Sequence, residues 1–457
     1  MTLIIVTMLL LSYVLIATGH LTGVNKAAIA MFLGTVGWVV YVCWGADFIT
    51  DQHPQDYAEW LGGIAPTSTN VKQYIYDHVF LNYVGRAAAI VLFLLATMSI
   101  VELLNNNGCF DFISEWIRTR NSKRLLWTIT LATFILSANL DNLTTTTMML
   151  VIMHNILQNS RQRMYVGSAI LLAACCGGCF TVIGDPTGLI LWGNGAVTAS
   201  RFSAYLFIPA FMAWVVPTIL INRELPDRLD TAWSPSPYRG DDTRLNRWQR
   251  IVMLIVGIGG LWFIPTFHNI TRLAPFLGAL CVLSVLWVVN EAFNRKLIAA
   301  DQMAQRRIPM SLQYGSLQQV LFIMGIMLGM GVVTETGVWG DVAQWADTYI
   351  HDIWMMGIAA GLLSSVVDTF TIAISNISLY KVGVGDVATN GAYWEVIAYS
   401  TAVGGCLLSV GSVSGLALMR AEHVSLGWYI KHLTPKVLLG WIIGFVALWL
   451  EINLVQI

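Results

Sequence analysis

The sequence predicts an all-α polytopic membrane protein with inverted repeats, two re-entrant helical hairpins, two broken transmembrane helices and about ten crossings. Three observations support this fold. Of the 457 residues, 56% are hydrophobic and only 11% are charged, whereas soluble domains are about 25% charged. Apolar runs long enough to cross a bilayer recur along the whole chain. Two further apolar runs are interrupted by the same polar motif, once in each half.

The first interruption is residues 137–147, Ser-Ala-Asn-Leu-Asp-Asn-Leu-Thr-Thr-Thr-Thr, which separates two apolar arms. An Asp at membrane depth costs ~2.5–3.5 kcal/mol on insertion scales, so such a residue is by default assigned to a functional site. The alternative is an N-capped helix break with Asp141 in an ordinary water-filled crevice. Recurrence of the motif argues against that alternative.

The motif recurs in the second half of the chain, where Ser364, Asp368 and Thr371 match Ser137, Asp141 and Thr144. With the same sequence offset and no gap, residues 177–188 match residues 404–415, including Gly-Gly-Cys at the start and two later glycines. Two motifs in one register indicate an internal repeat. Weak internal symmetry with polar interruptions at matching positions is typical of secondary transporters.

The runs 124–157 and 353–381 are predicted to be the re-entrant hairpins. Each consists of two arms of roughly 15 residues, and at 1.5 Å per residue such an arm passes the midplane of a ~30 Å core without crossing it. Non-helical backbone at that depth requires surrounding protein or water. The expected full crossings are residues 2–19, 27–45, 78–104, 164–193, 202–222, 249–267, 272–290, 316–335, 392–419 and 433–453.

The basic residues indicate the orientation. In this layout 20 of the 25 Lys and Arg residues, including Lys26, fall on one face. By the positive-inside rule that face is cytoplasmic, so both termini are predicted outside a bacterial-type cytoplasmic (inner) membrane. Counting either hairpin as a single span would break this asymmetry. The exceptions are Lys72, Arg86, Arg201, Arg272 and Lys381.

Four regions follow from this layout. Residues 1–77 form N-terminal helices and an outer loop, and residues 223–315 form a linker with connecting helices. The first repeat, 78–222, contains hairpin 124–157 and broken helix 164–193. The second repeat, 316–457, contains hairpin 353–381 and broken helix 392–419. The repeats are inverted because runs 78–104 and 316–335 enter from opposite faces.

The interruptions supply oxygen atoms that suit a hard cation such as Na⁺ or Li⁺. Arms that end at a break direct C-terminal carbonyls toward it, and this negative helix end favours a cation. We expect Asp141 and Asp368 to be the principal ligands. The other candidate ion- or proton-binding residues are Asn142, Thr144, Thr369, Thr371, Asp185, Thr187, Ser412, Ser137 and Ser364. Glycines at the breaks let backbone approach closely, although tight helix packing is an equal alternative for Gly177 and Gly178.

The charged residues near the interruptions predict that the substrate is a cation. The buried carboxylates have no Lys or Arg near them in the sequence, and Arg86 is the only basic candidate inside a run. A carboxylate that holds a proton without the metal ion and releases it on ion binding exchanges the two by competition. We assign Glu102 and Glu335 to the interface, with a role in the proton path as the alternative, and His154 and the other histidines to headgroups or packed interiors.

The remaining composition excludes several classes of protein. A net charge of −1 gives no indication of nucleic acid, and no cofactor motif or enzyme signature stands out. The seven cysteines lack metal-site spacing with His, so we interpret them as packing residues rather than disulfides. The expected partners are therefore membrane lipid and the transported cations. An intramembrane aspartyl protease is disfavoured because the carboxylates lie in repeat-related hairpins with hydroxyl neighbours.

Residues 140–145, 177–187, 363–368 and 404–412 together resemble the motifs of NhaD-type sodium/proton antiporters of the ion transporter superfamily. The resemblance implies a fold like that of the divalent-anion/sodium symporters, a homodimeric scaffold and elevator-type movement. Those symporters carry Ser-Asn-Thr at the hairpin tips, whereas Asp141 and Asp368 here favour antiport. Thr369 departs from the antiporters, which tend to have Asn there. The alternative is a sodium-coupled dicarboxylate or oxyanion carrier.

Overall fold

The computed structural model describes residues 2–117, 119–231, 245–298, 310–350 and 352–455. In these ranges the regular structure is helical, apart from two isolated β-bridges. The predicted all-α class is therefore confirmed. Parts of the predicted linker, residues 232–244 and 299–309, lie outside the described residues, as does Arg118.

Seven helices of the described residues are long and apolar enough to cross a membrane. The other three predicted crossings are short or interrupted: α1 (Thr2–Ala17) has 16 residues, and each broken helix is two separate pieces. The seven helices are Lys26–Cys43, Ser68–Asn106, Ala199–Asn222, Arg247–Thr271, Pro275–Phe293, Leu317–Glu335 and Thr434–Leu454. The chain is therefore a multi-pass membrane protein.

The predicted outer loop is itself helical. It contains α4 (Gly45–Gln52), α5 (Pro54–Leu61) and α6 (Ser68–Tyr74), and α6 continues through a π-helical turn into α7 (Leu81–Asn106). Polar composition suggested a loop, but local capping explains the helices. Pro54 begins α5, and the Thr67 hydroxyl accepts a hydrogen bond from the Asn70 amide at the start of α6.

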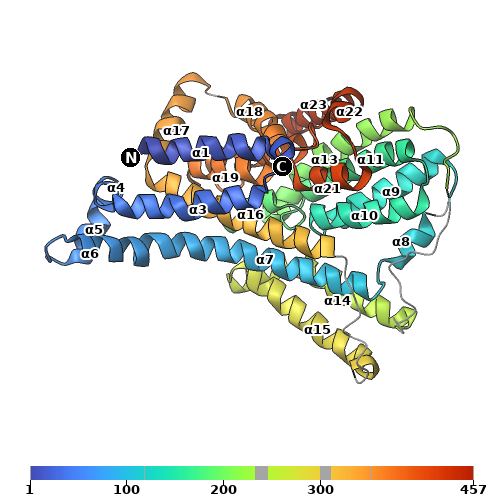
Figure 1. Ribbon diagram of the computed structural model, residues 1–457, viewed down its shortest axis with the longest axis horizontal. Helices are drawn as coiled ribbons and strands as arrows, with labels where there is room; N and C mark the ends of the chain where they lie inside the picture. The colour runs from blue at the N-terminus through green and yellow to red at the C-terminus, as the bar shows by residue number, and fades with distance from the viewer. Residues whose placement is uncertain (1, 118, 232–244, 299–309, 351, 456–457) are drawn as a thin grey trace.

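Long helices form a framework beside the hairpins (Figure 1). It comprises α1, α3 (Lys26–Cys43), α7, α14 (Arg247–Thr271), α15 (Pro275–Ile298) and α16 (Met310–Glu335), hereafter the framework helices. Glycines bring α3 and α16 together, since a Cβ on Gly34 would lie 2.8 Å from the Gly325 carbonyl oxygen. Close backbone approach through small residues is how membrane helices associate.

The first hairpin consists of α9 (Ser122–Ser137) and α10 (Asn142–Ile156), which are separated by a short break. Its two ends lie on one face. Asn121 forms a β-bridge with Arg228, and Leu157 forms one with Thr231. Residues 228 and 231 are three positions apart, so they are separated by at most about 11 Å. The run therefore returns to the face from which it entered.

The second hairpin consists of α18 (Ile353–Val366) and α19 (Thr369–Leu379). Its ends also lie together, because the Tyr380 hydroxyl after α19 donates a 2.6 Å hydrogen bond to Asp347 of α17 (Val338–Tyr349), just before α18. In Figure 1, α9 and α10 lie toward the right-hand end of the molecule and α17 lies toward the left-hand end. The two hairpins therefore enter from opposite ends.

The broken helices lie between the hairpins. The first is α11 (Ser160–Cys179) and α12 (Pro186–Gly193), and the second is α20 (Ala392–Gly404) and α21 (Val413–Glu422). The helices that follow, α13 (Ala199–Asn222) and α23 (Thr434–Leu450), pack on each other. There a Cβ on Gly440 would lie 2.7 Å from the Ala213 carbonyl oxygen, and these two residues occupy equivalent positions of the two repeats. Short helices α2 (Gly19–Thr22), α8 (Asp111–Trp116) and α22 (Leu426–His432) complete the fold.

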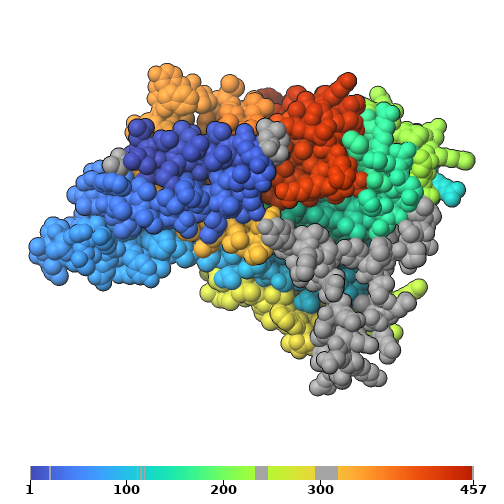
Figure 2. Space-filling view, in the orientation of Figure 1, coloured from blue at the N-terminus to red at the C-terminus, as the bar shows by residue number. Residues whose placement is uncertain are grey.

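The surface matches a lipid environment. Large apolar side chains point outward from the framework, for example Trp262 of α14 and Val288 of α15, which are 67% and 68% exposed. Figure 2 shows the dark-blue N-terminal helices on the surface directly beside the red C-terminal part. The first residues of the chain therefore lie against the second repeat.

We expect the two ends of the first hairpin to be labelled from one side of the membrane. Exposed positions are Lys123 and Ser160, so Lys123→Cys and Ser160→Cys are tested in a chain without its seven native cysteines. A membrane-impermeant maleimide should reach both from one and the same face, because the hairpin returns to the face from which it entered. Glu59→Cys in the outer helices should be labelled from the other face. Labelling of the two hairpin positions from opposite faces would contradict the re-entrant geometry.

Candidate functional site

The first hairpin tip is organised by Asp141, which is the N-cap of α10. Its Oδ2 accepts hydrogen bonds from the amides of Leu143 and Thr144, both at 3.1 Å, and lies 3.3 Å from the Thr144 hydroxyl. Asp is a preferred N-cap because its side chain satisfies amides that have no partner inside the helix. The local sequence therefore holds the carboxylate at the break.

The second tip repeats this geometry. Asp368 is the N-cap of α19, and its Oδ2 accepts from the amides of Phe370 and Thr371 at 3.1 and 3.3 Å. The Thr371 hydroxyl lies 3.5 Å from the same oxygen. Every donor has its counterpart in the first tip at the sequence offset that relates Asp141 to Asp368. The sequence repeat is thus also a repeat of hydrogen bonds.

The first broken helix joins the first tip directly. Asp185 is the N-cap of α12 and accepts from the Thr187 amide at 2.9 Å. The Asn142 side chain donates to Asp185 Oδ1 at 2.5 Å, and the Asn142 amide donates to the Gly184 carbonyl at 3.2 Å. The structure thereby brings four of the predicted site residues, Asp141, Asn142, Asp185 and Thr187, into one cluster.

The second broken helix has a hydroxyl where the first has a carboxylate. Ser412 is the N-cap of α21 and accepts from the Gly415 amide at 3.0 Å. Thr369 stands at the position of Asn142, and its methyl group packs where a Cβ on Gly405 would lie. The second half therefore has the same frame with fewer polar groups.

Ser137 and Ser364 hold the hairpins against the broken helices. The Ser137 hydroxyl donates to the Ala174 carbonyl and the Ser364 hydroxyl to the Thr401 carbonyl, both at 2.7 Å. Both serines are fully buried. Their hydroxyl protons are committed to the backbone, so their geometry fits a bracing role, with only an oxygen lone pair left to face an ion.

Glycine is required where hairpin and broken helix touch. A Cβ on Gly184 would lie 2.5 Å from the Ser137 carbonyl oxygen, and one on Gly411 would lie 2.6 Å from that of Ser364. Real side chains do not tolerate such distances. The repeated glycines therefore serve close backbone contact at the breaks.

The site is buried and rich in oxygen. Asp141, Asp185 and Asp368 are all buried, and Asp185 is close enough to interact electrostatically with both of the others. Two buried hydroxyls in matching positions, those of Thr187 and Ser414, have no hydrogen-bond partner of normal geometry among the described residues. Unsatisfied buried oxygens next to carboxylates are what a dehydrated cation requires.

Two contacts from the framework helices were not predicted. Gln319 of α16 donates from Nε2 to Asp141 Oδ1 at 3.3 Å, and its own Oε1 is buried without a partner in the described part of the chain. Lys26, at the start of α3, donates from Nζ to the carbonyls of Val410 and Val367 at 3.0 and 3.5 Å. The Lys26 ammonium also interacts electrostatically with Asp368.

Lys26 corrects the expectation that no basic residue lies near either tip. The sequence placed Lys26 among the cytoplasmic loop charges, and it is 341 residues from Val367. Arg86, the candidate named from the sequence, instead lies over the ring of Tyr83 at 6.0 Å. No local pattern marks Lys26, so only the packing of α3 on the second repeat could reveal it.

Glu335, which the sequence analysis assigned to the interface, is the last residue of α16 and contacts the outer helices. Glu335 is 7% exposed, accepts a 2.7 Å hydrogen bond from the Tyr83 hydroxyl, and lies 2.7 Å from His53 Nε2. The hydrogen bond to Glu335 raises the pKa of His53, which lies in the outer helices, while burial lowers it. The cluster fastens the outer helices to α7 and α16. The interfacial assignment of Glu102 stays a prediction.

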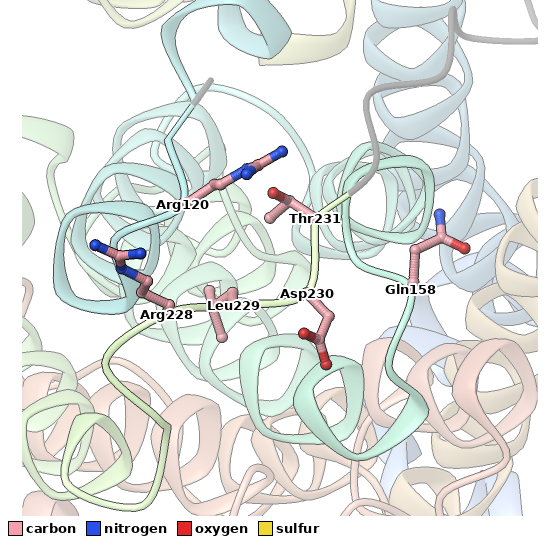
Figure 3. A pocket seen from close by; sticks show the side chains of 6 residues that line it. All are labelled: Arg120, Gln158, Arg228, Leu229, Asp230 and Thr231. Atoms are coloured by element: carbon pink, nitrogen blue, oxygen red, sulfur yellow. The ribbon is translucent and has the colours of Figure 1, made fainter.

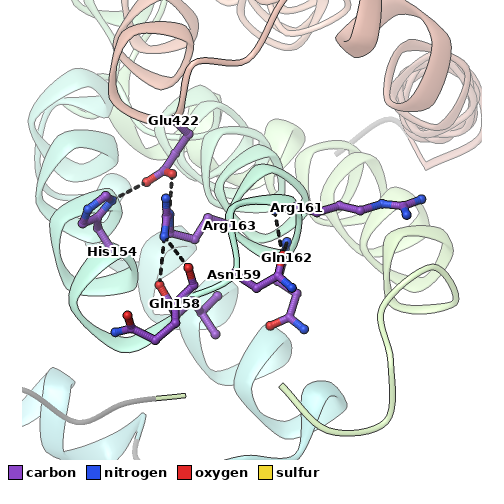
Figure 4. Close-up of polar contacts among 8 residues, drawn as sticks. His154, Gln158, Asn159, Arg161, Gln162, Arg163 and Glu422 are labelled. Carbon is purple, nitrogen blue, oxygen red and sulfur yellow. Dashed lines mark hydrogen bonds and ion pairs between the residues drawn. The ribbon is translucent and has the colours of Figure 1, made fainter. Parts of the chain in front are cut away.

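The base of the first hairpin carries a separate polar cluster (Figure 4). Glu422, at the end of α21, lies 2.9 Å from His154 Nδ1 and accepts from Arg163 Nε at 2.7 Å. Beside it, a surface pocket is lined by Arg120, Gln158, Arg228, Leu229, Asp230 and Thr231 (Figure 3). Both features lie where the hairpin ends, away from its tip.

Comparisons with known proteins agree with this architecture. The family model described as "Citrate transporter" matches residues 1–404. "Sodium/proton antiporter 1" of Arabidopsis thaliana is 29% identical over 364 residues, which cover 79% of this chain and 62% of that protein. "Na(+)/H(+) antiporter NhaD" of Vibrio cholerae is 28% identical over 414 residues, covering 83% and 80%. The chain thus spans less than two thirds of the plant relative.

A solved structure shares the fold. The YdaH transporter of Alcanivorax borkumensis, whose crystal structure is described as having an unusual topology, superposes with a TM-score of 0.58. The match covers 94% of this chain and 98% of that chain at 12% sequence identity. The resemblance predicted from the motifs, to NhaD-type antiporters, is confirmed by the curated relatives.

Proposed function

The chain belongs to the citrate transporter family, a family of carriers rather than enzymes, and from this premise we propose that it exchanges Na⁺ or Li⁺ for H⁺ across the cytoplasmic membrane. The observation that carries the proposal is the cluster of Asp141, Asp185 and Asn142 at a buried helix break. A cation and protons compete for these carboxylates, so binding of one releases the other. Relatives named as sodium/proton antiporters support the proposed exchange of a cation for protons.

The charges at the site support a cation rather than citrate. Three buried carboxylates, those of Asp141, Asp185 and Asp368, face one basic side chain of the described residues, Lys26. The Lys26 ammonium already donates to two backbone carbonyls, so it is not directed at an open anion site. A dicarboxylate substrate would be repelled by the three carboxylates gathered at the tips.

Movement of the hairpins and broken helices against the framework helices would give alternating access. The framework contributes Gln319 and Lys26 to the two tips, so the proposed ion path lies at the boundary of these two parts. We further propose that the exposed apolar faces of the framework support a homodimer, and that both termini face outward.

Sodium-dependent pH change in everted membrane vesicles tests the proposed function. Added Na⁺ or Li⁺ should dissipate an imposed proton gradient in vesicles that contain the chain, because each ion taken up expels protons from the site. Vesicles without the chain give the baseline. The competing carrier is tested by counterflow of a labelled dicarboxylate into proteoliposomes. Dicarboxylate counterflow without cation-dependent pH change would overturn antiport.

We expect Asp185→Asn to have an intermediate effect. Asn at this N-cap still accepts from the Thr187 amide, but one of the two carboxylates at the first break loses its charge. The second repeat has Ser412 at the equivalent position, so the frame does not require a carboxylate there. The apparent KM for Na⁺ in everted vesicles should rise by about tenfold or more, which corresponds to ~1.4 kcal/mol. A loss as complete as that of Asp141→Asn would contradict this ranking.

A further inference from the structure

We propose that the Lys26 ammonium is the resident cation of the second half of the site. It takes the place that a transported ion takes in the first half. The chain would therefore bind one Na⁺ at a time, at Asp141 and Asp185. This inference rests on the proposed cation/proton exchange, and it replaces the expectation that Asp368 is itself a ligand of the transported ion.

The position of Lys26 is that of a bound cation. Its Nζ is held by the carbonyl of Val410, in the break between α20 and α21, and by the carbonyl of Val367, at the end of α18. The C-terminal end of a helix carries partial negative charge and attracts cations. The Asn25 side chain caps α3 by accepting from the Ala27 amide at 2.9 Å, which fixes where Lys26 leaves the helix.

The repeat shows what Lys26 replaces. At the sequence offset that relates Asp368 to Asp141, Val367 and Val410 correspond to Leu140 and Ile183 in the first half. Among the described residues, no hydrogen bond reaches the carbonyl oxygen of Leu140 or of Ile183. These two carbonyls, beside Asp141 and Asp185, are left available for an ion from solution.

The charged side chains also differ between the two halves, and the difference again leaves room for a transported cation only in the first half. The first half carries two carboxylates, Asp141 and Asp185, and no Lys or Arg contact is present there within the described ranges. The second half carries Asp368 and Lys26, with Ser412 in place of the second carboxylate. The first half is thus short of positive charge, whereas the second is already compensated.

Two cations cannot share the second half. An ammonium and a sodium ion at contact distance repel strongly in a medium of low dielectric constant. Sodium could bind there only if Lys26 withdrew. Lys26 is anchored at the first turn of α3, and α3 is packed tightly on α16. The geometry therefore assigns the two halves different roles.

Equilibrium binding of ²²Na⁺ to the purified full-length chain at alkaline pH tests this inference. The wild-type chain should bind one ion, and Asp141→Asn should bind none. Lys26→Met should bind a second ion, and Lys26→Met combined with Asp141→Asn should retain one. Lys26→Gln, which keeps a hydrogen-bond donor without the charge, should also gain an ion. Lys26→Arg should behave as wild type.

Lys72→Met is the matched control, because Lys72 is exposed on α6 and its loss changes the net charge equally. Two ions bound per wild-type chain would overturn the inference, whether or not the variants fold. Unchanged stoichiometry in folded Lys26→Met and Lys26→Gln would also overturn it. Absence of cation-dependent pH change in wild-type vesicles would instead refute the proposed antiport, so the two failures are distinguishable.

Discussion

Asp141→Asn should abolish cation/proton exchange while leaving the protein in the membrane. Asn is as good an N-cap as Asp, so its side-chain oxygen still accepts from the amides of Leu143 and Thr144. The substitution removes the charge that would hold either the ion or the proton. Loss of one partner from a buried charge pair typically costs ~3–5 kcal/mol, which is more than about a hundredfold in affinity.

The measurement is Na⁺-dependent pH change in everted vesicles, normalised to the amount of protein in the membrane. Asp51→Asn provides the matched control, because Asp51 is exposed at the end of α4 in the outer helices and is not among the contacts of either tip. Its exchange should equal that of wild type. Exchange by Asp141→Asn at more than a tenth of the wild-type rate would remove Asp141 from the proposed site.

Asp368→Asn should cause a comparable loss of exchange, for a different reason. The N-cap of α19 survives through the Asn oxygen. The Lys26 ammonium, however, loses the nearby carboxylate that balances its charge inside the membrane, and an uncompensated buried charge is strongly destabilising. The uncompensated charge also opposes entry of Na⁺ into the neighbouring first half.

A second substitution separates two roles for Asp368. If Asp368 mainly compensates Lys26, the combination of Lys26→Met with Asp368→Asn should recover part of the exchange lost in Asp368→Asn. The assay is again everted vesicles, with thermal unfolding of the purified proteins as a check on stability. A double variant as inactive as the single one would show that Asp368 itself carries the proton or the ion.

Much of the fold follows from local sequence. The lengths of the apolar runs set which segments can cross a ~30 Å core, and the seven long helices of the described residues fall within the predicted runs apart from extensions at their ends. The hairpin tips are equally local, because Asp141 and Asp368 cap the helices that directly follow them. The outer helices were missed, since their capping signals are short and their composition is polar.

The sequence by itself determined the membrane class, the repeat and the buried carboxylates. The length of an apolar run and the N-cap residue of a helix can each be read from a short stretch of sequence. The repeat can be read by comparing two stretches at a constant offset. The functional difference between the halves can be read from the sequence only in part, namely from Asp185 in the first half and Ser412 at the equivalent position of the second.

Only the tertiary structure decided which framework side chains reach the site. Gln319 meets Asp141 across 178 residues, and Lys26 meets Val410 across 384. The physical reason is that a side chain on a long helix has no local signature of what its partner helix places beside it. Charge compensation in a membrane depends on that proximity. Whether Lys26 belongs to the solvent or to the site was therefore fixed by the packing of α3 on α16 and on the second repeat.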